Sequence, residues 1–94
     1  MQLLLHNGLH LAIENNNNRA RLVVYNGREE CVCRKESFAA LQKFTQQATA
    51  HIFKGRLQLQ KNEDAILVEV KGEPAGKIST ADFIHALNLH TPHK

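Results

Sequence analysis

The stretch Ala20–Phe44, "ARLVVYNGREECVCRKESFAALQKF", decides the fold because it aligns without a gap with Ala65–Leu89, "AILVEVKGEPAGKISTADFIHALNL". The two stretches lie 45 positions apart and share five identities in 25 aligned residues. These identities coincide with an apolar strand pattern, a turn glycine and a helix start, so we interpret the chain as two pseudo-equivalent units. The identical pairs are Ala20/Ala65, Leu22/Leu67, Val23/Val68, Gly27/Gly72 and Phe38/Phe83.

Each unit is predicted to contain three antiparallel strands followed by a helix. The first strand alternates apolar and polar residues, which is typical of a half-buried strand, and the second is rich in β-branched residues. The dipeptides Asn26-Gly27 and Lys71-Gly72 favour a tight turn before the third strand. The segments "QLLLH" and "HIF" are expected to extend the first strands. The predicted strands are 9–15, 21–25 and 29–34 in the first unit and 55–61, 66–70 and 74–79 in the second.

Two amphipathic helices close the units. Ser37 is the expected N-cap of the first helix, and Ser79 or Thr80 is the expected N-cap of the second. Pro92 ends any continuation of the second helix, so "HTPHK" is predicted to be a frayed tail. The apolar stripes consist of Phe38, Leu41, Phe44 and Ala48 in the first helix and Phe83, Ala86 and Leu87 in the second.

These elements predict an α+β fold, a tandem βββα-βββα pseudo-repeat whose six-stranded antiparallel sheet carries two helices on one face. The chain is expected to form one domain, residues 1–94, from units of about 1–50 and 51–94. Arg21, Val23 and Tyr25 alternate with Ala20, Leu22 and Val24, so neither face of the middle strand is cleanly polar. A sheet of this kind can be covered on both sides, and we therefore expect a homodimer.

Cys31 and Cys33 raise the question of metal binding or redox chemistry. One residue separates them, so a regular strand would put both on one side, about 6.5–7 Å apart, which is poorly suited to a disulfide. The chain contains no second cysteine pair to complete a zinc knuckle. The 45-residue offset pairs Cys33 with Ile78. We therefore predict that Cys33 fills a core position, as buried free cysteines often do.

The remaining residues give no pattern typical of catalysis or cofactor binding. Six histidines are scattered along the chain without familiar ligand spacing, and a site that combines some of them with Cys31 is the more distant alternative. The chain has no glycine-rich phosphate loop and no nucleophile motif. We expect no enzyme activity, no cofactor and no metal site. The histidines are His6, His10, His51, His85, His90 and His93.

Composition and charge restrict the class of protein further. The 94 residues are 43% hydrophobic and 22% charged, and no apolar run approaches the length of a membrane span. The start "MQLLLHNG" lacks a basic n-region and a cleavage site, so a cytoplasmic protein without membrane contact is expected. The formal net charge of +3 permits contact with nucleic acid.

Basic residues gather near the strand ends. Arg19, Arg21 and Tyr25 fall on or near one strand. A positively charged sheet with an aromatic residue can hold a phosphate backbone and stack a base. The alternative is an ordinary solvated polar face. The candidate nucleic-acid-binding residues are Arg19, Arg21, Tyr25, Arg34, Lys35, Lys54 and Arg56.

The order of "LHLAIENNNNRARLVVY", "EECVCRK" and the helix "ESFAALQKF", repeated in tandem, resembles the Pur-alpha and Whirly type of single-stranded nucleic-acid binders. The resemblance rests on layout and covers most of the chain. It implies repeated antiparallel strands plus a helix, dimerisation, and a sheet that faces nucleic acid, with Arg19, Arg21 and Tyr25 on the facing strand.

Two functions from different classes follow from these observations. The first is a small non-catalytic nucleic-acid-binding module that uses a basic sheet face, with single-stranded nucleic acid as one option. The second is a protein–protein interaction or regulatory module, such as a small inhibitor, that binds a protein partner or its own twin through the sheet. A salt-dependent oligonucleotide titration separates the two.

Overall fold

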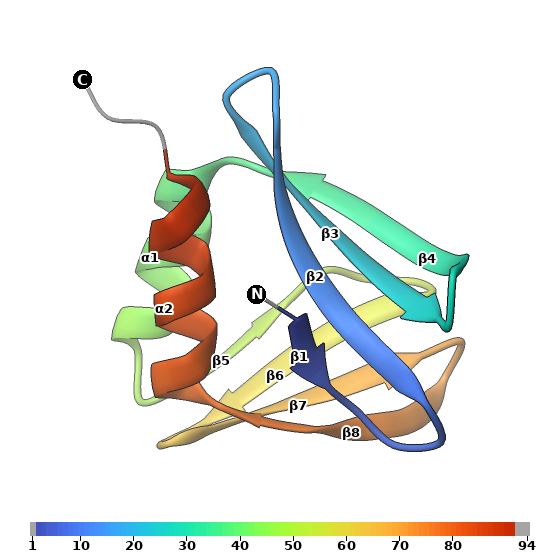
Figure 1. Cartoon of the computed structure of the whole chain (residues 1–94). Coiled ribbons are helices and arrows are strands. Elements are labelled where there is room, and N and C mark those ends of the chain that lie inside the picture. Colours follow the sequence, from blue (N-terminus) through green and yellow to red (C-terminus); the bar gives the residue numbers. More distant parts are fainter. Residues whose placement is uncertain (1, 92–94) are drawn as a thin grey trace.

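The computed structural model describes residues 2–91 and contains two four-stranded antiparallel sheets, each followed by a helix (Figure 1). Sheet A has the strand order β1-β2-β3-β4, and sheet B has the order β5-β6-β7-β8. The first unit comprises β1 (Gln2–Leu4), β2 (Leu9–Asn16), β3 (Arg19–Asn26), β4 (Glu29–Glu36) and α1 (Phe38–Gln46). The second comprises β5 (Thr49–Ile52), β6 (Leu57–Asn62), β7 (Ala65–Val70), β8 (Glu73–Ser79) and α2 (Thr80–His90).

The α+β class and the tandem arrangement are confirmed, but the single six-stranded sheet with three strands per unit is wrong. The segments expected to lengthen the first strands fold back as separate edge strands, β1 and β5. Asn7 and Gly8 both take a positive φ between β1 and β2, and Phe53 and Gly55 do so between β5 and β6. These left-handed residues reverse the direction of the chain. The sequence analysis expected no reversal there, because the apolar and polar residues continue to alternate through the turn.

One hydrophobic core fills the space between the two sheets and the helices. Figure 1 shows the sheets facing each other at an angle, with α1 and α2 side by side along one side of the pair. Phe44 and Phe83 meet edge to face, with ring centroids 6.3 Å apart, and so join the helices. The helices therefore seal the opening between two sheets and do not cover one face of a single sheet.

The helix predictions hold in their main features. The side-chain oxygen of Ser37 accepts a hydrogen bond from the Ala40 N–H, and that of Ser79 accepts one from the Asp82 N–H, so Ser79 is the cap of α2. Ala48 lies beyond the end of α1 and is exposed. Of the predicted frayed tail "HTPHK", His90 is instead the last residue of α2 and Thr91 is its C-cap, whereas residues 92–94 lie outside the described residues. In residues 2–91, neither helix is long and apolar enough to cross a membrane.

The tandem layout is confirmed, but an offset of 45 residues misaligns strands β3 and β7 by one residue. The first turns, Asn17-Asn18 and Glu63-Asp64, lie 46 positions apart, whereas the second turns, 27–28 and 71–72, lie 44 apart. Strand β3 has eight residues and β7 has six, which accounts for the change. Leu22 is consequently fully buried, whereas its aligned partner Leu67 is 42% exposed. A one-residue slip exchanges the two faces of a strand.

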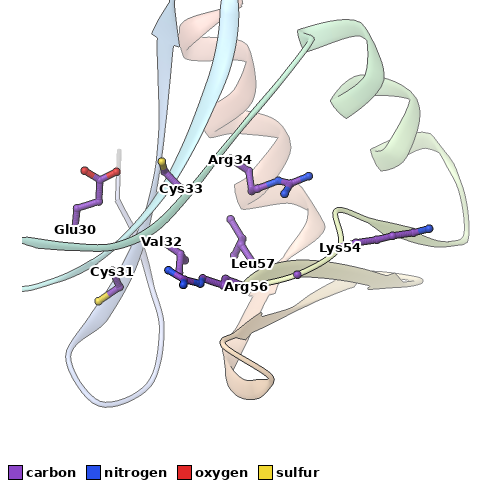
Figure 2. Close-up of a pocket in the computed structure, with 9 residues that line it drawn as sticks. Glu30, Cys31, Val32, Cys33, Arg34, Lys54, Arg56 and Leu57 are labelled. Carbon is purple, nitrogen blue, oxygen red and sulfur yellow. The ribbon is translucent and has the colours of Figure 1, made fainter.

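The prediction that Cys33 fills a core position is wrong for the same reason. Cys33 is exposed, whereas Ile78 is buried. The ladder between β3 and β4 slips at a β-bulge, where Val24 is opposite Val32 but Tyr25 is opposite Glu30. The extra residue is Cys31, which is half-buried and packs against the core. The bulge therefore turns the two thiols to opposite sides of β4 (Figure 2).

Candidate functional site

A groove of about 440 Å³ lies where the two sheets meet (Figure 2). One wall is β4, which contributes Arg34, and the other is the loop between β5 and β6, which contributes Lys54 and Arg56. We call this feature the basic groove. It brings together three of the seven sequence-predicted residues from segments about 20 positions apart in the chain. Its remaining lining residues are Glu30, Cys31, Val32, Cys33, Gly55 and Leu57.

Local backbone geometry positions the cations of the groove. Phe53 takes a positive φ of 70°, an unusual conformation for a bulky residue, and its ring is buried at the core edge. The Arg34 guanidinium lies 5.4 Å from the centroid of that ring, at cation–π distance. Gly55 has a φ of 96°, which the turn between Lys54 and Arg56 requires. The groove is therefore built by a strained turn that is anchored in the core.

The basic groove carries net positive charge. Within residues 2–91, no ion pair involves Arg34, Lys54 or Arg56. The single acidic lining residue, Glu30, forms an ion pair with Arg21 on the outer face of sheet A. Three exposed cations in a concave surface raise the local concentration of an anionic ligand.

Arg21 and Tyr25 belong to a different, internally paired cluster on the outer face of sheet A. The Arg21 guanidinium donates hydrogen bonds to Glu14, at 2.9 Å, and to Glu30. The Tyr25 hydroxyl donates to the other oxygen of Glu14, at 3.1 Å. The hydrogen bond with the Glu14 carboxylate raises the pKa of Tyr25 and also raises the pKa of Arg21. The charge of Arg21 is therefore compensated within the protein.

The last two predicted residues, Arg19 and Lys35, also lie away from the groove. Arg19 is exposed and forms a 4.0 Å ion pair with Glu36. Lys35 is exposed and lies opposite Arg21 in the β3–β4 ladder. The structure thus divides the seven residues into three in the basic groove and four on or beside the outer face of sheet A.

Lys71 is a neighbouring cation that the sequence analysis missed. Its backbone N–H donates a 2.6 Å hydrogen bond to the carbonyl of Arg56, so the turn between β7 and β8 adjoins the groove. No pattern in the sequence shows that this turn lies beside the groove, because its position depends on how β6 and β7 pair. Lys71 extends the run of basic positions beyond the loop.

The described part of the chain contains no group of three or more histidine, cysteine or acidic residues arranged to hold a metal ion. Comparison with protein-family models, with curated proteins and with solved structures found no match to this chain.

Proposed function

We propose that this chain is a small non-catalytic nucleic-acid-binding module whose basic groove holds the phosphate backbone. The observation that carries the proposal is that Arg34, Lys54 and Arg56 all line one groove and that none of them forms an ion pair within residues 2–91. Arginine and lysine side chains bind phosphate through charge-assisted hydrogen bonds. The phosphate backbone would then contact the junction between the sheets and not the sheet face expected from sequence, because Arg21 is already paired with two carboxylates.

The strand count adds support to the layout resemblance. Pur-alpha and Whirly proteins have four strands in each unit, and each unit of this chain also has four strands followed by a helix. A similar layout alone does not establish a function. The proposal therefore rests first on the charge and shape of the groove.

The test is binding of a fluorescently labelled oligonucleotide, followed by anisotropy in about 50 mM salt, where backbone contacts are strong. The double variant Lys54→Ala/Arg56→Ala should weaken binding, and Arg34→Ala should weaken it further. The matched control is Lys43→Ala/Lys77→Ala, which removes the same charge from α1 and from β8, outside the groove lining. Absence of binding by the wild-type protein, or equal losses in the two double variants, would refute the assignment.

Homodimerisation through the sheet remains a prediction, as does the alternative of an interaction or regulatory module that binds a protein partner or its own twin. A light-scattering mass that stays at one chain across a wide concentration range would exclude the dimer.

A further inference from the structure

The outer face of sheet A carries a row of side chains that the basic groove does not use. Leu4 lies opposite His10, His10 opposite Tyr25, and Tyr25 opposite Glu30. Directly opposed residues in an antiparallel sheet project to the same face. The row therefore crosses all four strands of sheet A, and we call its first three members the stacking row.

The rings of His10 and Tyr25 lie against each other, with centroids 5.3 Å apart and planes 22° apart. They line an open depression of about 350 Å³ beside the β3–β4 turn. Both side chains are only half-buried. The other residues that line the depression are Ala12, Glu14, Gly27 and Arg28.

The Tyr25 ring is held in place before any ligand arrives. Its hydroxyl donates to Glu14, which is itself fixed by Arg21. Val23 projects to the same face and is 0% exposed, although it lies outside the core between the sheets. The hydrogen bond from Tyr25 to Glu14 spans the position of Val23 along the strands, so the network covers this valine. A preorganised ring loses little conformational freedom on binding.

Leu4 continues the row outward onto the edge strand β1. It is 78% exposed, the highest value among the large hydrophobic residues of the described chain. An exposed leucine next to an aromatic pair gives a contiguous apolar surface across β1, β2 and β3. A planar apolar group resting on His10 and Tyr25 would cover part of Leu4 as well.

We propose that the stacking row is a base-stacking subsite, which takes a nucleobase of the strand whose phosphates occupy the basic groove. The inference rests on the proposed function. Glu30 connects the two sites, because it lines the groove and also lies opposite Tyr25 in the ladder. A strand that leaves the groove across the β4 edge therefore meets the stacking row next. Aromatic side chains accept any base, because every base has a π-face.

The chain provides its own probe of this subsite, since Tyr25 is the sole tyrosine and there is no tryptophan. Intrinsic emission, excited at the red edge of tyrosine absorption where DNA absorbs weakly, reports on this ring alone. A single-stranded oligonucleotide should quench the emission as it binds. An abasic oligonucleotide of equal length should bind more weakly and leave the emission unchanged.

Variants test the same subsite without relying on fluorescence. Tyr25→Ala should weaken binding of the normal oligonucleotide roughly 5- to 150-fold, the range for one stacked base, and leave the abasic affinity unchanged. Because Tyr25→Ala also uncovers Val23, Leu4→Ala is the second variant, since truncation of a side chain that is 78% exposed leaves the core packing intact. It should weaken only the normal oligonucleotide. Leu67→Ala, an exposed leucine on sheet B, is the matched control and should change neither affinity.

The outcomes distinguish this inference from the proposed function. Equal affinity for normal and abasic oligonucleotides, with unchanged emission, would overturn the stacking subsite and leave the basic groove standing. Failure of both oligonucleotides to bind would overturn the two proposals together.

Discussion

The salt dependence of oligonucleotide binding gives a quantitative test of the basic groove. Each phosphate contact with a single strand contributes about −0.7 to the slope of log affinity against log salt concentration. Three cations, Arg34, Lys54 and Arg56, therefore contribute a slope of about −2. Between 50 and 200 mM salt, this contribution alone lowers the affinity roughly 20-fold. Removing Lys54 and Arg56 should make the slope shallower by about 1.4.

The assay is anisotropy of one labelled single-stranded oligonucleotide at four or more salt concentrations. Wild-type protein, Lys54→Ala/Arg56→Ala and the control Lys43→Ala/Lys77→Ala are compared at constant pH. The control removes two charges as well, so it separates contacts in the groove from the effect of net charge. The reasoning fails if the control flattens the slope as much as the groove variant does, or if the wild-type affinity does not depend on salt.

Three further predictions concern single side chains. Iodoacetamide should modify exposed Cys33 faster than half-buried Cys31, as peptide mass spectrometry can measure; equal rates would contradict the bulge geometry. The absorbance of Tyr25 should titrate above its ordinary pKa of 10.0, and Glu14→Gln should move this pKa down, because the carboxylate hydrogen bond favours the protonated phenol. The hydrogen bond from Tyr25 to Glu14 stabilises the fold below about pH 10, and this stabilisation is lost as the pH rises through the raised pKa of Tyr25. A wild-type titration without a raised pKa would contradict this hydrogen bond. Lys61 is 6% exposed, and its ammonium donates a hydrogen bond to the C-cap carbonyl of α1. Lys61→Ala should therefore lower the free energy of unfolding by about 2–3 kcal/mol, as urea melts can measure. A loss under about 1 kcal/mol would show that this hydrogen bond contributes little to stability.

The candidate site illustrates the limit of reasoning from residue type alone. Arg21 and Arg34 are both arginines on strands of sheet A, and their neighbours along the chain do not distinguish them as ligand-binding residues. The structure pairs Arg21 with two carboxylates and leaves Arg34 in the groove over Phe53. This difference depends on cross-strand register, which brings Glu14 opposite Arg21. Register is a pairing between strands and cannot be read from one strand's pattern.

The cysteines show the same limit at the level of one strand. Strict alternation predicts that Cys31 and Cys33 share a face. This prediction is wrong, because β4 has an extra residue opposite the step from Val24 to Tyr25 on β3. A β-bulge adds one residue on one strand only, so it has no fixed signature in sequence. The short edge strands β1 and β5 were missed because three or four residues carry too little periodicity to be recognised.

The sequence by itself determined the local elements: alternating strands, helices capped by Ser37 and Ser79, and two units in tandem. These depend on interactions within a few residues, which residue order records directly. Only the tertiary structure decided that the units form two sheets that share a core, and that β4 meets the loop carrying Lys54 and Arg56. Such contacts join segments far apart in the chain. They depend on how the whole apolar surface is buried at once, so residue order within one segment does not reveal them.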